Sequence, residues 1–197
     1  MATKEAYKII NEETKKLLFL SDEDRLEMLN NILECSNDNK EKFIFAACYI
    51  YGLRPAELIM LRRGWLSVKE DTLWIRIPTK KGGDERIIVL GLGVPFMDFI
   101  TNYISNIDDP EALLFDFKHP SNFNHIINRM VKRYNLKFGS SIKITPYVFR
   151  KFRLSWILSS GGSVTDVLAY KGGKSLKPLE NSYIFLRPVN RFKDSLK

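Results

Sequence analysis

The sequence contains four segments whose residue types could act together on a phosphate group. A guanidinium can hold two phosphate oxygens at once, an ammonium group can donate a proton, and a phenol oxygen can serve as a nucleophile. The segments are YGLRPAELIML (51–61), IRIPTKKGGDERIIVL (75–90), TPYVFRKFRLSWILSSGGSVTDVLAYKGG (145–173) and the region around Tyr183. Their combination favours chemistry at a phosphate.

Each segment also has an ordinary structural interpretation when it is taken alone. Arg54 could be a surface arginine beside a helix start, and Lys80 and Lys81 could form the solvated tip of a hairpin. Tyr183 could be an aromatic residue in the core of a C-terminal helix. The case for chemistry therefore depends on the four segments together, in their order and spacing.

The overall composition favours a nucleic-acid partner. The 197 residues include 31 Lys and Arg against 23 Asp and Glu, which gives a net charge of +8. Such an excess favours a polyanion, because each neutralised phosphate releases condensed counterions.

Composition also limits the class of protein. Cys35 and Cys48 lack metal-ligand spacing and the chain has only 2 histidines, so we expect a reduced protein with no metal and no cofactor. No apolar stretch approaches the roughly 18 residues that a membrane span needs. The start of the chain lacks the apolar core of a signal peptide, which predicts a soluble cytoplasmic protein.

The first part of the chain is predicted to be helical. Residues 1–20 suggest a leading helix or a linker remnant rather than a domain of its own. Ser21 is a plausible N-cap for the next helix, which is expected to end around residues 37–39.

The turn that carries Arg54 is predicted to lie between two helices. Residues 40–51 have the pattern of an apolar helix that Gly52 ends, and Pro55 suits the first turn of another helix. We therefore expect Arg54 at a fixed place in a tight turn.

The remaining elements are a hairpin and a second group of helices. Between Trp65 and Leu90 the apolar residues alternate, which predicts a small antiparallel hairpin with a basic tip. Further helices are predicted at about 95–106 and 120–135, from Thr145 to Gly161, from Ser163 to Ala169, and after Pro178. The pattern indicates one α+β domain, mainly α-helical with a small antiparallel β-sheet.

The first two segments resemble motifs of the tyrosine recombinase (phage integrase) family. On this resemblance Arg54 is the first catalytic arginine, and Glu57, three residues later, is a supporting carboxylate that orients it. The hairpin match assigns the catalytic lysine to Lys81, with Lys80 as the close alternative.

The third segment carries the strongest match to the same family. Arg150 takes the place of the second catalytic arginine, and Tyr147 occupies the position where the family usually has His. The family has a further hydrogen-bond donor about 23 residues after the second arginine. A strict count from Arg150 gives Gly173, and the nearest side-chain donor is Lys174. Tyr183, nine residues after Lys174, is then the nucleophile.

The resemblance implies both a fold and a reaction. It implies the tyrosine recombinase catalytic-domain fold, double-stranded DNA as the partner, and cleavage and rejoining of strands through a 3'-phosphotyrosine intermediate. It also implies a homo-oligomer, a tetramer on DNA, for DNA recombination and integration. The Phe-Arg-Lys-Phe run at 149–152 looks like integrases of archaeal viruses and plasmids. The whole chain, 1–197, is expected to be a single catalytic domain that lacks the family's N-terminal core-binding domain.

Roles for the individual side chains follow from the resemblance. The two arginines would hold the nonbridging phosphate oxygens, and Lys81 would protonate the leaving 5' oxygen. Tyr147 and Lys174 would add hydrogen-bond donors. Six other basic residues could bind flanking phosphates, a role that positions the protein without reading sequence: Arg62, Arg63, Lys132, Arg133, Lys151 and Arg153.

Three alternatives compete with the recombinase interpretation. The first is a DNA-binding protein that uses the same scaffold without chemistry, which the departures at Tyr147 and Lys174 motivate. The second is a type IB topoisomerase, which shares the Arg, Lys, Arg, Tyr chemistry. The third is an unrelated basic helical module that binds RNA or protein.

Overall fold

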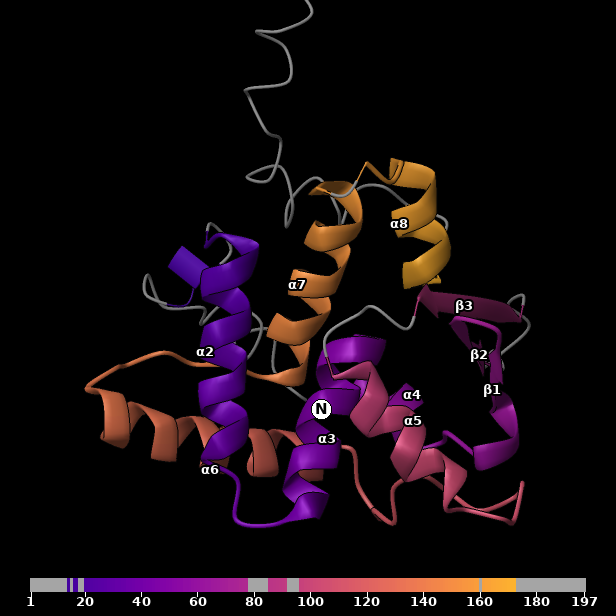
Figure 1. Ribbon diagram of the computed structural model, residues 1–197, viewed down its shortest axis with the longest axis horizontal. Helices are drawn as coiled ribbons and strands as arrows, with labels where there is room; N and C mark the ends of the chain where they lie inside the picture. The colour runs from indigo at the N-terminus through magenta and orange to yellow at the C-terminus, as the bar shows by residue number, and fades with distance from the viewer. Residues whose placement is uncertain are drawn as a thin grey trace, which may run out of the picture.

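The computed structural model describes residues 14, 16, 17, 20–77, 85–91, 96–159 and 161–172. These residues form helices packed around one core, with a small sheet at one end (Figure 1). The helices are α2 (Asp22–Glu34), α3 (Asn39–Tyr51), α4 (Pro55–Leu58), α5 (Met97–Ser105), α6 (Ser121–Phe138), α7 (Pro146–Ser159) and α8 (Val164–Lys171), with a short 3-10 helix, η3 (Arg63–Trp65). The strands are β1 (Leu66–Lys69), β2 (Thr72–Ile77) and β3 (Arg86–Gly91).

Helix α3 forms the centre of the core. It is buried almost all round from Phe43 to Tyr51, as expected for a helix without a charged face in that stretch. Helices α5, α6 and α7 all pack against it. The rings of Phe45 and Phe149 meet edge to face with centroids 5.0 Å apart, which joins α3 to α7. Because the Arg54 turn follows α3 directly, this packing fixes where the turn begins.

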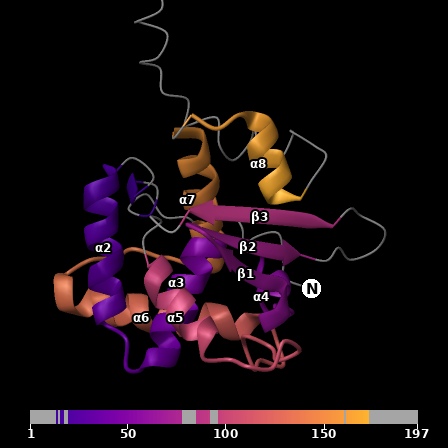
Figure 2. The ribbon, with the colours of Figure 1, turned by 45° about the vertical axis from the view of Figure 1, so that its right-hand side comes forward.

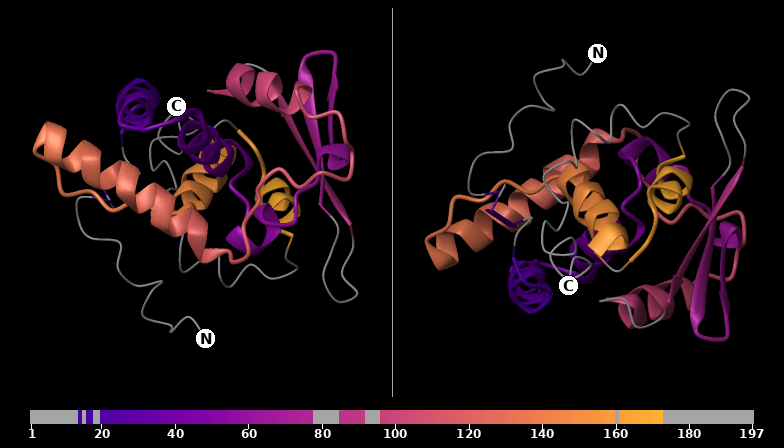
Figure 3. Two further views of the ribbon diagram at one scale, coloured as in Figure 1. Left: turned by 90° about the horizontal axis from the view of Figure 1, so that it is seen from below. Right: turned by 90° about the horizontal axis from the view of Figure 1, so that it is seen from above.

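The sheet lies at the opposite end of the molecule from α2 and the outer part of α6 (Figures 1 and 3). Its three strands are antiparallel in the order β1-β2-β3. Leu73 pairs with Leu90 and Ile75 with Ile88, and these four side chains are buried. Helix α8 lies beside β3, as Figure 2 shows and as the contacts between the two elements confirm.

Most of the predicted elements are confirmed. Ser21 caps α2, Gly52 ends α3 in the left-handed conformation, and Pro55 begins α4. Thr145 precedes α7, and Ser163 caps α8 through a capping box.

The structure corrects one predicted boundary and adds detail to two other predictions. Helix α2 ends at Glu34 rather than around residues 37–39, because Asp38 caps the next helix and the chain must turn before it. Helix α4 is a single turn. The predicted hairpin is part of a three-stranded sheet, because β1 pairs with the free edge of β2.

Some predictions concern residues outside the described ranges. They are most of the leading segment 1–20, the hairpin tip 78–84 and everything after Gly172. In the part of the chain that the structure describes, no helix is long and apolar enough to cross a membrane.

Candidate active site

The turn between α3 and α4 packs closely against α7. Gly52 has a φ of +51°, and a Cβ there would lie 2.9 Å from Cβ of Arg153 and 3.6 Å from Cα of Arg150. A side chain at residue 52 would therefore be strained by both its backbone conformation and this contact. The glycine allows the turn to bring Arg54 next to the helix that carries Arg150.

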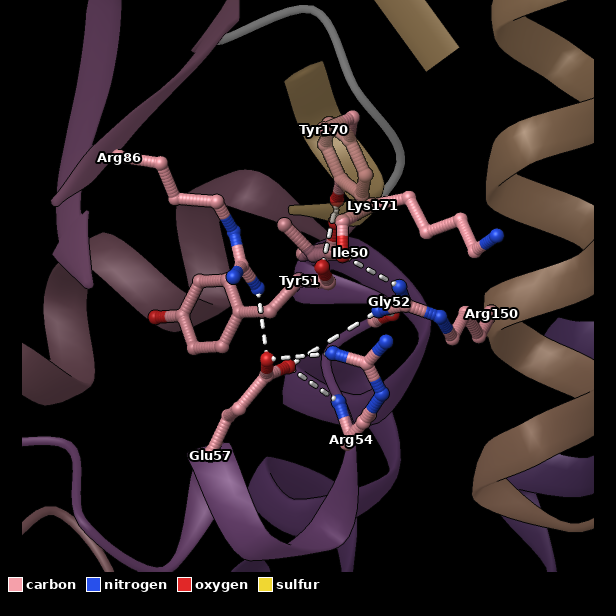
Figure 4. A network of polar contacts seen from close by, with 9 residues as sticks. All are labelled: Ile50, Tyr51, Gly52, Arg54, Glu57, Arg86, Arg150, Tyr170 and Lys171. Carbon is pink, nitrogen blue, oxygen red and sulfur yellow. Dashed lines mark hydrogen bonds and ion pairs between the residues drawn. The ribbon is translucent and has the colours of Figure 1, made fainter. Parts of the chain in front are cut away.

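Glu57 is the meeting point of three arginines from three different elements (Figure 4). Its Oε2 accepts the backbone N–H of Arg54 at 2.8 Å, and its Oε1 accepts Nη1 of Arg54 at 2.9 Å. Nη2 of Arg86, from β3, donates to the same Oε1 at 2.8 Å. Nη1 of Arg150, from α7, lies 3.9 Å from Oε2. One carboxylate thus orients guanidinium groups from the turn, the sheet and α7.

Arg150 is almost completely buried, with 5% of its surface exposed. Its Nη1 donates to the carbonyl oxygen of Gly52 at 3.2 Å, and its Nη2 donates to the carbonyl oxygen of Lys171 at 2.9 Å. Lys171 ends α8, where backbone carbonyls have no partner within the helix. Arg150 therefore has a fixed orientation before any ligand binds, which is the condition for electrostatic preorganisation.

The cluster has an excess of positive charge. Burial raises the pKa of Glu57, but the hydrogen bonds from Arg86 and from the backbone of Arg54 outweigh it and hold this pKa below its usual value. Glu57 is therefore a carboxylate, and three guanidinium groups surround one negative charge. The Arg54 side chain is 48% exposed, so it can reach an anion from solvent while Glu57 holds one of its nitrogens.

Helix α8 contributes two further residues to this region. The hydroxyl of Tyr170 donates to the carbonyl oxygen of Tyr51, which fixes α8 to the end of α3. The Lys171 side chain extends over Arg150 (Figure 4). Partial burial, together with the positive charges of Arg150 and Arg54, lowers the pKa of Lys171. The end of α8 therefore borders the same positive cluster.

The structure brings together Arg54, Glu57 and Arg150, three of the predicted site residues. Tyr147 lies one turn before Arg150 on α7, and its ring contacts Nζ of Lys151 at 5.1 Å from the centroid. Burial lowers the pKa of Lys151. Five other predicted site residues lie outside the described ranges, so their roles remain predictions: Lys80, Lys81, Gly173, Lys174 and Tyr183.

Sequence reasoning missed Arg86, Tyr170 and Lys171. A signal for Arg86 was present in the Glu-Arg pair that opens the second hairpin strand, but its partner is 29 residues away. The signal for Lys171 was its place two residues before the predicted donor position at Gly173, although the predicted helix ended at Ala169.

The basic residues predicted to bind flanking phosphates have different surroundings. Nη1 of Arg62 donates to the carbonyl oxygen of Glu111 at 2.6 Å, and Nε of Arg63 to that of Ile104 at 2.7 Å. Arg133 is paired with Glu41, and Arg153 is buried with its guanidinium 5.9 Å from the Tyr170 ring centroid. Lys132 is exposed on α6. Lys132 is therefore better placed for flanking phosphates than Arg153.

The sequence of the chain matches the Phage integrase family over residues 19–187. No curated protein matches it. The fold is similar to that of XerA recombinase, with a TM-score of 0.65 and 19% identity over 90% of this chain and 61% of that chain. It is also similar to XerH site-specific recombinase bound to difH substrate in a pre-cleavage complex, with a TM-score of 0.64 and 15% identity over 90% of this chain and 52% of that one.

A third solved structure adds a transposon protein. The Tn1549 transposon integrase in complex with circular intermediate DNA has a TM-score of 0.60 and 16% identity, over 90% of this chain and 64% of that chain. This chain therefore spans only about half to two thirds of the length of these three proteins.

Proposed function

The chain belongs to the phage integrase family of tyrosine recombinases, and from this premise we propose that it is a catalytic domain that cleaves and rejoins DNA strands through a 3'-phosphotyrosine intermediate. The observation that carries this proposal is the cluster in which Glu57 orients Arg54 and Arg150. Two fixed guanidinium groups with a net positive field suit a phosphodiester whose charge grows in the transition state.

In the first half of the reaction, the Tyr183 oxygen attacks phosphorus and the bond from phosphorus to the 5' oxygen breaks. The phenol has an ordinary pKa of about 10, so it must pass its proton to water as the new bond forms. The leaving 5' oxygen takes a proton from Lys81 or, alternatively, from Lys80. The product is a 3'-phosphotyrosine and a free 5' hydroxyl.

The second half reverses these steps with a DNA hydroxyl as the nucleophile. That oxygen attacks the phosphotyrosine, the tyrosine oxygen leaves and regains its proton, and the DNA strand is continuous again. Because the phosphotyrosine conserves the energy of the broken ester, the cycle needs no external energy source.

Arg54 and Arg150 share the work of binding the nonbridging oxygens. Arg150 is fixed by the carbonyl oxygens of Gly52 and Lys171, whereas Arg54 is held on one side by Glu57 and is open on the other. Lysine at either position would keep the charge and lose the forked geometry. Tyr147 and Lys174, or the backbone at Gly173, add donors in this proposal.

Double-stranded DNA is the proposed partner. The net charge of +8 supports it, as does the presence of DNA in the XerH and Tn1549 integrase structures. Assembly as a tetramer on DNA, action inside the cell and a relationship to archaeal virus and plasmid integrases are further parts of the proposal.

A DNA-binding protein without chemistry is the second candidate. It is favoured by Tyr147, which stands where the family usually has His. It is also favoured by Gly173, which has no side-chain donor and takes the place of another family donor when residues are counted strictly from Arg150. Such a protein would shift DNA in a gel and never become covalently attached to it.

Incubation with a nicked suicide duplex separates the two candidates. We expect the wild-type chain to form a protein–DNA adduct that survives denaturing electrophoresis, and Tyr183→Phe to form none. Binding of the same duplex by both proteins, without an adduct from either, would favour the non-catalytic candidate.

A further inference from the structure

Arg86 is the one arginine of the cluster that no part of the proposed reaction uses. It is the first residue of β3, and its Nη2 donates to Oε1 of Glu57 at 2.8 Å. Figure 4 shows it reaching from the sheet toward the turn, on the side of Glu57 away from Arg150. It is therefore a link between the strand that follows the hairpin tip and the turn that carries Arg54.

The surroundings of Arg86 keep it away from a DNA phosphate. Its side chain is only 13% exposed, and its buried Nε has no hydrogen-bond partner in the part of the chain that the structure describes. Gly172 lies so close that a Cβ there would be 2.2 Å from Nη1 of Arg86. A buried N–H without a partner costs stability, so the position of this guanidinium is best explained by its bond to Glu57.

The bond matters because Oε1 of Glu57 also accepts Nη1 of Arg54. While Arg86 occupies part of Oε1, the carboxylate is held in one orientation, with Oε2 toward the backbone N–H of Arg54 and toward Arg150. Without Arg86, the carboxylate could turn fully toward the side chain of Arg54 and form a tighter, two-bond pair. That pair would compete with a phosphate for the exposed arginine.

We propose that Arg86 is a positioning residue for strand cleavage, which holds Glu57 so that Arg54 and Arg150 stay oriented toward the scissile phosphate. This role depends on the proposed function. It acts through Glu57, and Arg86 itself does not touch DNA.

The test compares Arg86→Met with Arg76→Met, measuring the rate of covalent adduct formation on a suicide duplex at saturating protein. Arg76 is a suitable control, because it lies in the neighbouring strand, pairs with Glu85 and is 63% exposed. We expect Arg86→Met to slow adduct formation roughly 10- to 100-fold, because a small displacement of catalytic groups can cost up to about 100-fold in rate, while its affinity for DNA stays close to that of the control. Arg86→Lys, which can still donate to Glu57, should recover much of the rate.

A double-mutant cycle and a pH profile distinguish positioning from a general loss of structure. If Arg86 acts through Glu57, Arg86→Met should add little to the defect of Glu57→Gln. The groups that face Glu57 are Arg54, Arg86 and Arg150. The hydrogen bond from Arg86 lowers the pKa of Glu57, so Arg86→Met should raise that pKa. Cleavage by the variant should therefore fail at a higher pH than cleavage by the wild-type chain when the solution is acidified.

A second variant reaches Arg86 without changing it. Gly172→Ala places a methyl group against Nη1 of Arg86 in a left-handed backbone conformation, and it should slow cleavage in the wild-type background. The same substitution should slow cleavage less in the Arg86→Met background, because the guanidinium that the new methyl group would contact is absent there.

The outcomes separate this inference from the proposed function. No adduct from the wild-type chain would overturn both. A wild-type chain that cleaves, together with Arg86→Met that cleaves as fast as Arg76→Met, would overturn only the role of Arg86. Additive defects in the cycle with Glu57→Gln would also overturn it.

Discussion

Two glutamates of this protein each hold more than one arginine, and their clusters differ in what they can do. Glu41, in α3, pairs with Arg133 and lies 3.7 Å from Arg129. Both of these arginines come from α6, and the carboxylate of Asp38 accepts the backbone N–H of Glu41 at 2.7 Å. One carboxylate therefore holds two arginines of a single helix, and this cluster joins α3 to α6.

The cluster around Glu57 has one more arginine, and its arginines come from different elements. One carboxylate faces Arg54, Arg86 and Arg150, which come from a turn, a strand and a helix. A larger charge excess and convergence from several elements favour a phosphate site, whereas two arginines from one helix join that helix to α3. Glu41 also accepts the backbone N–H of Asn37 at 2.9 Å, so its cluster ties the loop between α2 and α3 to α6.

The largest difference should appear when a guanidinium is replaced in each cluster. Arg150→Lys should reduce the rate of adduct formation about 100- to 1000-fold, because a preorganised donor to the transition state is lost. Arg54→Lys should act in the same direction. Single-turnover cleavage of a suicide duplex measures both, with Arg133→Lys as the control, which should keep its cleavage rate. Full cleavage by Arg150→Lys would remove the distinction between the clusters.

Protonation of Glu57 should weaken its cluster at low pH. The pKa of Glu57 is held below its usual value by Arg86 and Arg54 against the opposing effect of burial. Its stabilising contribution is therefore present above the unfolded pKa of about 4.3 and is lost as the pH falls through the lower folded pKa.

The measurement is acid unfolding of the wild-type chain and of Glu57→Gln. The difference in their unfolding free energies should stay constant from neutral pH to about pH 5 and shrink below about pH 4. Glu57→Gln should also cleave at least as slowly as Arg86→Met at neutral pH, roughly 10- to 100-fold below the wild-type chain, since the amide cannot orient both arginines as an ion pair does. A stability difference that changes between pH 7 and pH 5 would contradict this assignment.

The smallest effect on chemistry, and the clearest effect on stability, is expected at Glu41. Its side chain is 8% exposed, so Arg133→Met would leave a largely buried carboxylate short of a partner. We expect a loss of about 1–3 kcal/mol in the free energy of unfolding, measured by urea denaturation. Cleavage per folded molecule should not change. If Arg133→Met slowed cleavage without lowering the free energy of unfolding, the Glu41 cluster would have a role in the reaction and the comparison would be wrong.

The local parts of the fold and site could be predicted from the sequence. Gly52 and Pro55 are helix stop and start signals, so the turn with Arg54 between two helices followed from them. Glu57 follows Arg54 by three residues, which is the spacing of a capping box, and their pairing is local. Arg150 was found because its segment resembles a family motif.

The long-range parts could not be predicted. Alternation predicted a strand here, but residues 87–90 are all aliphatic, so the pattern does not show which pair faces the core. In the sheet, Ile88 and Leu90 are buried, whereas Ile87 and Val89 are about half exposed. Strand β1 was missed because its pattern is too short to be distinctive. The bond from Arg86 to Glu57 depends on how the sheet docks onto the helices, which no local spacing encodes.

The most direct test of the account identifies the residue and the DNA end in the covalent adduct. The adduct from a suicide duplex would be digested with protease and nuclease, and the modified peptide sequenced by mass spectrometry. The account predicts a nucleotide joined through its 3' phosphate to Tyr183. A 5' linkage, or attachment to another residue such as Tyr147 or Tyr170, would contradict it.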